Sequence, residues 1–295
     1  MQYRYTQSTY YGGGNYYGPS FGYHAGITSG VRSLLIANIA VFIIQQLARI
    51  LEPYLGFYWF DMLFGLVPSS VVRYGFVWQP FTYMFLHGGV LHLLFNMLVV
   101  WMFGCDVERH WGTRRFLKFY ILSGLAAAAC TMVVAIFVRG ISIHPTIGAS
   151  GAVLGVLVAY AMLFPDNRIT LLLAFIIPVT MKARTLAIGL TCITVLYILS
   201  TPPGGGGVAH FAHLGGLAFG YFYMKFGDRF EMTLRRWRGR RAERRLRARS
   251  ERKEAYDRFM REEVDPILDK ITRQGTESLT ARERSILRRA QKMRR

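Results

Sequence analysis

The sequence predicts an all-α, polytopic membrane protein built around a bundle of six transmembrane helices. Three observations point to this class. The chain contains a series of long apolar runs, small residues recur every four positions within two of those runs, and the three cysteines form no disulfide or metal-binding pattern. Apolar and aromatic residues make up 52% of the 295-residue chain, yet its formal net charge is +19. Apolar and charged residues are therefore concentrated in different parts of the chain.

Six apolar runs come close to the roughly 20 residues that a helix needs to cross a bilayer. They occupy residues 33–51, 90–106, 116–138, 150–164, 183–200 and 208–226. The shorter apolar segment after the fourth run contains Pro178, and we expect an interfacial or re-entrant connection there. Together the runs define a six-helix membrane domain over residues 33–226.

Two segments of different composition flank this domain. Residues 1–32 are rich in Tyr and Gly and lack the basic start and apolar middle of a signal peptide, so we expect a flexible arm. Residues 227–295 hold 23 basic and 12 acidic residues, a net charge of +11, and we expect a basic, helical tail. A basic tail beside a membrane is typical of contact with anionic lipid, and nucleic acid is not expected as a partner.

Positive charge in the short links predicts the orientation of the helices. Seven basic residues lie in the links after the second and fourth runs: Arg109, Arg114, Arg115, Lys118, Arg168, Lys182 and Arg184. Because short cytoplasmic loops are enriched in Lys and Arg, both termini are expected in the cytoplasm. The long first link, residues 52–89, is aromatic and is expected to lie on or in the outer leaflet, with His87 near the interface.

Polar side chains inside a bilayer are costly and mark candidate functional sites. Ser150 begins the fourth run and His213 lies near the start of the sixth, which runs in the same direction, so both should lie at similar depth. His92 and Asn96 occupy the outer end of the second run. His210 lies one turn before His213, and we expect it at the rim of the site or in a cavity.

Small residues predict close packing between the helices that carry Ser150 and His213. They recur every four positions in both runs, as Gly151, Gly155 and Ala159 and as Ala212, Gly216 and Gly220. Small residues at this spacing let two helix backbones approach each other. The serine hydroxyl and the histidine imidazole would then lie close together.

This combination of residues favours acyl-transfer chemistry. A serine becomes a useful nucleophile when a base lies beside it, and histidine suits that role because its pKa is near neutrality. Asp166 lies at the far end of the fourth run, about 24 Å from Ser150 at 1.5 Å per helical residue, so we expect a Ser–His dyad without a carboxylate. His92 and Asn96 are four residues apart on one helix face and could donate hydrogen bonds to an oxyanion.

The motifs resemble those of the rhomboid family of intramembrane serine proteases. "GASG" at 148–151 is similar to the family's GxSG, and "AHLGGLAFG" at 212–220 to its AHxxGxxxG. "HLLFN" at 92–96 is similar to its HxxxN, and "GCDVE" at 104–108 to its GxxxE. The resemblance covers roughly residues 33–226. The last part of the tail also resembles a short helical module of bacterial rhomboids.

The resemblance implies a role for each of these residues. Ser150 corresponds to the nucleophile and His213 to the general base, while His92 and Asn96 correspond to the oxyanion-stabilising pair. Glu108 corresponds to a structural anchor for the first loop. Substrates would be other membrane proteins, cut in or near a transmembrane helix, and no metal or cofactor would be needed. The resemblance to bacterial members implies a multi-pass protein of the bacterial inner membrane.

Two positions depart from the pattern of some family members: Gln79 follows Trp78 where some carry Arg, and a second departure follows the nucleophile of others. Those members have an aromatic ring four residues after the nucleophile, which packs on the catalytic imidazole, whereas this chain has Leu154. The orientation of the imidazole must then come from elsewhere.

Other interpretations of the same residues remain open. Ser150 could be a helix cap, and the histidines and Asn96 could tie helices together. A catalytically silent relative that binds or escorts membrane proteins would share this fold. A histidine-based transporter is disfavoured because no paired intramembrane carboxylates accompany the histidines.

Overall fold

The computed structural model describes residues 26–55, 59–137, 145–173, 176–200 and 208–293. Most of the arm expected at residues 1–32 therefore lies outside the described residues. The chain divides into two compact units, Met1–Phe226 and Gly227–Arg295. Each unit is described by itself.

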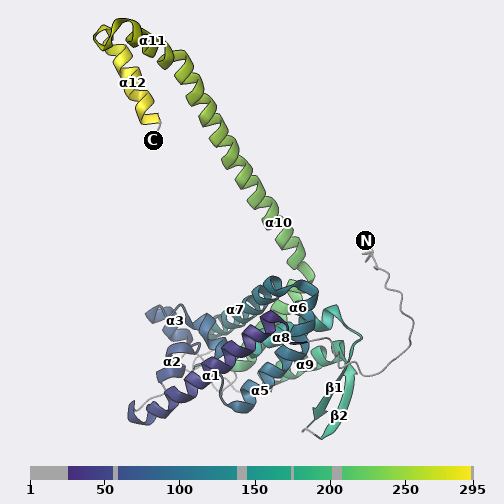
Figure 1. The fold of residues 1–295 in the computed structure, drawn as a ribbon. Coiled ribbons are helices and arrows are strands. Elements are labelled where there is room, and N and C mark those ends of the chain that lie inside the picture. Colours follow the sequence, from purple (N-terminus) through teal and green to yellow (C-terminus); the bar gives the residue numbers. More distant parts are fainter. Residues whose placement is uncertain (1–25, 56–58, 138–144, 174–175, 201–207, 294–295) are drawn as a thin grey trace, which may run out of the picture. The chain divides into compact units, whose positions relative to one another are not determined.

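The first unit is a helical bundle of membrane type (Figure 1). Its main helices are α1 (Ser29–Leu55), α5 (Val90–Val99), α6 (Cys105–Trp111), α7 (Thr113–Phe137), α8 (Ser150–Leu163), α9 (Ala183–Ser200) and the first part of α10 (Val208–Phe259). A π-helical turn, η2 (Val100–Gly104), joins α5 to α6, so the second predicted span continues to Trp111. Among the described residues, four helical stretches are long and apolar enough to cross a membrane, and α8 is a shorter apolar helix. The protein is a polytopic helical membrane protein, and the number of six spans stays a prediction.

Helix α8 lies in the core of this bundle. It has no polar face, and most of its side chains are buried, as expected for a helix surrounded by others. It packs against α5, α6, α7 and α9. Its length is 14 residues, which corresponds to about 21 Å at 1.5 Å per residue and is less than the roughly 30 Å of a bilayer core. Ser150, its first residue, therefore begins below one surface of the membrane if the other end of the helix reaches the opposite surface.

The first link folds into short helices, α2 (Trp59–Phe64), α3 (Pro68–Tyr74), α4 (Gln79–Thr82) and the 3-10 turn η1 (Tyr83–Phe85). Buried polar side chains satisfy its backbone. Gln79 is fully buried; its amide oxygen accepts from the Val67 N–H at 3.0 Å, and its amide nitrogen donates to the Met62 carbonyl at 2.8 Å. These hydrogen bonds hold the link in a defined shape against α1 and α7.

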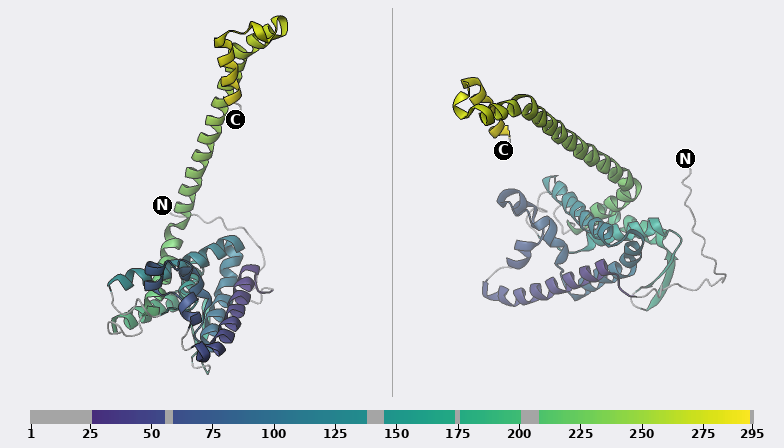
Figure 2. Two further views of the ribbon diagram at one scale, coloured as in Figure 1. Left: turned by 90° about the vertical axis from the view of Figure 1, so that its left-hand side faces the viewer. Right: turned by 45° about the horizontal axis from the view of Figure 1, so that its top comes forward.

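A β-hairpin follows α8, where the sequence predicts an interfacial or re-entrant connection. Strands β1 (Arg168–Leu173) and β2 (Ile177–Lys182) pair antiparallel, with Arg168 opposite Lys182. The hairpin extends away from the helices of its unit (Figure 1; Figure 2, right). Pro178 is tolerated because a two-stranded ribbon has only edge strands. The backbone of this segment is thus paired with itself, and its interfacial or re-entrant position stays a prediction.

The second unit contains the end of α10, the π-helical turn η4 (Met260–Val264), α11 (Asp265–Gln274), the 3-10 turn η5 (Thr276–Ser278) and α12 (Ala281–Met293). Among its described side chains, the buried apolar residues are Val264, Ile267 and Ala290. Thr280 and Glu283 form a capping box, in which the Glu283 carboxylate accepts from the Thr280 N–H at 2.7 Å. The same carboxylate accepts from Lys270 on α11 at 3.0 Å and so links the two helices.

Candidate functional site

Ser150 is the first residue of α8, directly after a tight turn of the backbone. Gly148 has a φ of +128°, a value that L side chains rarely adopt. Its N–H donates to the Tyr83 carbonyl at 2.9 Å, and Thr146 pairs with Leu66 in an isolated β-bridge. These contacts fix the turn to the first link, and the turn presents the serine at the N-terminus of the helix.

The structure brings Ser150 and His213 together. The Oγ of Ser150 lies 2.7 Å from the Nε2 of His213 on α10, within hydrogen-bonding distance, in a partly buried setting. The two residues are 63 positions apart in the sequence. A hydroxyl hydrogen-bonded to an imidazole is the arrangement from which the imidazole can remove the hydroxyl proton.

Small residues make this contact possible. A Cβ added to Gly216 would overlap the carbonyl oxygen of Gly151, and one added to Gly220 would lie 2.8 Å from the carbonyl oxygen of Gly155. The backbones of α8 and α10 therefore touch at two successive helical turns. Helix α7 also lies close, since a Cβ on Gly155 would overlap the Ser123 hydroxyl.

The His92 imidazole lies against the turn that carries Ser150. A Cβ added to Gly148 would lie 2.8 Å from its Cε1 and 2.9 Å from its Nε2. The Gly88 N–H points at the Nδ1 of His92 at 3.2 Å, so that nitrogen accepts a hydrogen bond. In the neutral imidazole the proton then lies on Nε2. His92 thus presents a hydrogen-bond donor beside the turn that precedes Ser150.

Asn96 is placed differently from His92. It is buried on α5, one turn further along, and its side-chain amide nitrogen donates to the His92 carbonyl at 2.9 Å. This hydrogen bond turns the NH₂ group back onto its own helix. The two residues share a helix face, as their spacing predicts. His92 directs its Nε2–H toward the turn before Ser150, whereas the Asn96 NH₂ group is engaged by its own helix.

His87 is a part of this region that the sequence does not reveal. Its side chain is fully buried within the protein, while its position near the membrane interface stays a prediction. Its ring lies edge-on to His92 with 5.1 Å between ring centroids. The backbone N–H of His87 donates to the side-chain oxygen of Gln45 on α1 at 3.0 Å. Burial, together with the neighbouring His92, lowers the pKa of His87 to about 4, so it is neutral at neutral pH. The same Gln45 donates to the buried Asp61 at 2.6 Å.

Glu108 has a structural position, but not against the first link, as the family resemblance would have it. Its carboxylate accepts from the Gly30 and Val31 N–H groups, both at 2.8 Å, and from the Thr28 and Thr113 hydroxyls. It therefore caps the N-terminus of α1, where free N–H groups and the helix dipole favour a negative charge. The expectation of an anchor for the first loop is corrected accordingly.

The structure also shows the surroundings of His210 and Leu154, which the sequence does not determine. His210 is half-buried on α10, where its ring stacks on Tyr197 of α9. Leu154 is partly buried and packs against the main apolar core. Among the described residues, no group of three His, Cys, Asp or Glu side chains is arranged to hold a metal ion.

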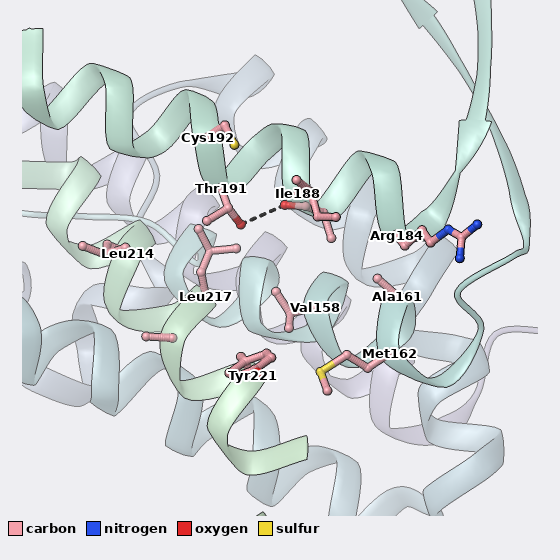
Figure 3. Close-up of a pocket in the computed structure, with 12 residues that line it drawn as sticks. Val158, Ala161, Met162, Arg184, Ile188, Thr191, Cys192, Leu214, Leu217 and Tyr221 are labelled. Atoms are coloured by element: carbon pink, nitrogen blue, oxygen red, sulfur yellow. Dashed lines mark hydrogen bonds between the residues drawn. The ribbon is translucent and has the colours of Figure 1, made fainter. Parts of the chain in front are cut away.

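A separate cavity of about 510 Å³ lies between α8, α9 and α10 (Figure 3). Its lining residues are Val158, Ala161, Met162, Arg184, Ala187, Ile188, Thr191, Cys192, Leu214, Leu217, Ala218 and Tyr221. The lining is almost entirely apolar, and the Thr191 hydroxyl is engaged with the Ala187 carbonyl at 2.8 Å. Neither Ser150 nor His213 lines it, so this cavity is distinct from the Ser–His site.

Comparison with known proteins yields two family matches. The model of the rhomboid domain matches residues 74–229, which is just over half of the chain. The model of a family of unknown function (DUF6576) matches residues 251–292.

Several characterised proteins are similar in sequence. Rhomboid protease GluP of Bacillus subtilis (strain 168) is 34% identical over 161 residues, which cover 54% of this chain and 28% of that protein. RHOMBOID-like protein 4 of Arabidopsis thaliana is 32% identical over 160 residues, covering 53% and 36%. Rhomboid protein 1, mitochondrial, of Saccharomyces cerevisiae is 30% identical over 203 residues, covering 65% and 51%. The chain thus spans between 28% and 51% of the length of these relatives.

Proposed function

This chain belongs to the rhomboid family, and we propose that it is an intramembrane serine endopeptidase with Ser150 as nucleophile and His213 as general base. The observation that carries the proposal is the 2.7 Å approach of the Ser150 Oγ to the His213 Nε2 where α8 and α10 cross. A protein that only bound or escorted membrane proteins would not need this pair. The similarity to Rhomboid protease GluP supports the same reaction class.

The reaction follows from the positions of the side chains. His213 removes the Ser150 hydroxyl proton as the oxygen attacks the carbonyl carbon of a substrate peptide bond. The resulting oxyanion is stabilised by the His92 Nε2–H and by free backbone N–H groups at the N-terminus of α8. The protonated His213 then gives its proton to the leaving amine, and a covalent acyl-serine remains. Water, activated by the same imidazole, hydrolyses the acyl-serine and restores the enzyme.

Asn96 completes the proposed oxyanion-stabilising pair in a supporting position. Its hydrogen bond to the His92 carbonyl steadies the turn of α5 that carries the imidazole. We assign the larger share of oxyanion stabilisation to His92, because its Nε2 faces the turn before Ser150.

The substrates are transmembrane proteins, cut in or near a helix that unwinds easily. In this proposal the reaction takes place below the membrane surface, where a membrane-embedded segment can reach Ser150; the position of Ser150 at the start of a short, central helix supports this. We place the protein in the bacterial inner membrane with both termini in the cytoplasm, in keeping with the basic links. The basic tail then faces anionic lipid, and no nucleic acid, metal or cofactor takes part.

The decisive experiment uses the full chain in liposomes with a single-span substrate protein. Wild type cleaves it, and Ser150→Ala and His213→Ala do not. A fluorophosphonate probe labels wild type, and the label is lost in Ser150→Ala. Matched controls are Ser33→Ala and His110→Ala, which change the same residue types at exposed positions and keep activity. Cleavage by Ser150→Ala at the wild-type rate would disprove the proposed nucleophile, and an inert wild type would favour the silent relative.

A further inference from the structure

The His213 imidazole has ring neighbours on its own helix and on α9. The His210 and His213 ring centroids are 5.9 Å apart, with an angle of 78° between the planes. Tyr197 stacks on His210, with centroids 4.9 Å apart and planes only 10° from parallel. Three rings therefore run in sequence from α9 to the imidazole that contacts Ser150.

This sequence of rings gives the His213 imidazole the aromatic neighbour that Leu154 does not provide. An imidazole turns about two side-chain bonds and keeps one orientation only where neighbours restrict both. Leu154 is aliphatic and packs into the apolar core, so it offers no ring to stack on the imidazole. His210 lies three residues before His213, on the same face of α10, and its ring meets that of His213 edge-on.

His210 needs a support of its own, and Tyr197 provides it. Its near-parallel phenol ring covers one face of the His210 imidazole. Tyr197 belongs to α9, which is 22% buried over its most apolar stretch, the lowest value among the four long spans of the described chain. Over its first half, α9 borders the cavity shared with α8 and α10 (Figure 3). The ring stack is thus a specific contact between α9 and α10 beyond the part of α9 that borders this cavity.

We propose that Tyr197 and His210 are positioning residues that hold the His213 imidazole in line with Ser150, and that they make the base depend on the position of α9. The inference rests on the proposed function, since it assigns the support of that catalytic base. When α9 lies against α10, Tyr197 fixes His210, and His210 fixes His213. When α9 moves away, the imidazole is free to leave the serine.

Ring-removing and ring-keeping variants test this proposal in the full chain. Tyr197→Ala and His210→Ala remove a ring, whereas Tyr197→Phe and His210→Phe keep one. Leu196→Ala is the matched control, because it is an exposed neighbour of Tyr197 on the same helix. The measurements are kcat and KM for a single-span substrate in liposomes, together with the rate constant of fluorophosphonate labelling at Ser150.

Each alanine variant should lower kcat and the labelling rate by about 10- to 100-fold with KM unchanged, because a misplaced base affects the chemical step. The phenylalanine variants and Leu196→Ala should stay close to wild type. The double alanine variant should be within about twofold of the worse single variant, since both residues act through one contact. Full kcat in the alanine variants, or losses that multiply in the double variant, would overturn the proposal.

A measurement that needs no turnover separates this inference from the proposed function. NMR spectra of protein with ¹⁵N-labelled histidine, assigned with His213→Gln, report the surroundings of the His213 ring. The His213 resonances should shift in Tyr197→Ala and stay in place in Tyr197→Phe. An unchanged His213 signal in Tyr197→Ala would reject the ring support, whether or not wild type cleaves a substrate. An inactive wild type with the expected shift would reject only the proposed function.

Discussion

The Nε2–H of His92 is the side-chain donor that the structure places beside the turn before Ser150. Its direction depends on the Gly88 N–H, which occupies the other ring nitrogen. Asn96 instead donates to a carbonyl of its own helix. The two members of the predicted pair should therefore contribute unequally to catalysis.

Substitution of each member measures that inequality. His92→Ala should lower kcat by about 100- to 1,000-fold with little change in KM, as loss of an oxyanion donor does. Asn96→Ala should lower kcat less, because it removes a support of the α5 turn and leaves the His92 donor in place. Steady-state kinetics of both variants in liposomes check the order. A larger loss of kcat in Asn96→Ala would show that the amide itself contacts the oxyanion.

The contact between Ser150 and His213 could be predicted from the sequence. The pairing of Ser150 with His213 follows from their equal depth and from the small residues beside them. The burial of His87 and its contact with Gln45 could not be predicted, because the two residues come from separate segments and share no pattern. The stack of Tyr197 on His210 also joins separate helices, and no spacing rule relates them.

The crossing of α8 and α10 is the element-level contact on which the site depends. At Gly216 there is no room for a methyl group, because the Gly151 carbonyl fills the space where a Cβ would lie. Gly189 on α9 has open space around its Cα. The same substitution at the two positions should therefore have opposite effects.

Gly216→Ala should destabilise the fold by about 1–3 kcal/mol, as overpacking does, and should strongly reduce labelling of Ser150. Gly189→Ala should leave labelling unchanged and stabilise α9 by about 0.5–1 kcal/mol, the usual gain of alanine over glycine in a helix. Unfolding midpoints in detergent and fluorophosphonate labelling provide the measurements. Normal labelling of Gly216→Ala would show that the backbones need not touch.

In the second unit, the capping box of α12 makes the stability of this helix depend on pH. Hydrogen bonds from the Thr280 backbone and hydroxyl and from Lys270 lower the pKa of Glu283 to about 2, from 4.5. A carboxylate with a lowered pKa stabilises the folded state above its unfolded pKa, and this contribution is lost as the pH falls from about 4.5 to about 2.

Hydrogen exchange of the α12 amides in the full chain tests this prediction. Wild type should exchange more slowly than Glu283→Gln at pH 5 to 7, and the difference should vanish near the pKa of about 2. Comparison of the two proteins at each pH cancels the intrinsic pH dependence of exchange. Glu277→Gln, on the neighbouring 3-10 turn, is the control and should match wild type. A difference that persists at pH 2 would contradict the role of the charge.

Element boundaries were predictable where apolar runs end in polar residues. Helix α9 begins and ends at the residues predicted for the fifth run, 183–200. The hairpin of β1 and β2 could not be predicted, because a short apolar segment does not distinguish a strand from a buried or interfacial helix. Helix α10 continues to Phe259, past the predicted end of the sixth run, because arginine and glutamate favour helix as well as apolar residues do.

At the scale of the whole molecule, the chain divides into two compact units between Phe226 and Gly227. All of the residues proposed for the reaction belong to the first unit. The second unit has its own small set of buried residues and its own family match. We therefore expect proteolysis to be a property of the first unit.

Truncation after Phe226 tests this division. The shortened chain should cleave a single-span substrate in liposomes with a kcat similar to that of the full chain. Adding anionic lipid to the liposomes should change the kcat of the full chain more than the kcat of the truncated chain, because the tail carries a net charge of +11. A truncated chain that inserts and labels normally but fails to cleave would place substrate recognition in the tail.

The capping of the N-terminus of α1 by Glu108 affects the order in which the bundle is completed during synthesis. Helix α1 is made first, but the carboxylate that completes its N-terminal hydrogen bonds lies 78 residues later in the chain. Until α6 is inserted, the Gly30 and Val31 N–H groups must find partners in water or lipid headgroups. The N-terminus of α1 is therefore fully hydrogen-bonded only after the second predicted span, which ends with α6, has been inserted. The first helix to be made thus reaches its final packing only after a later helix has been added.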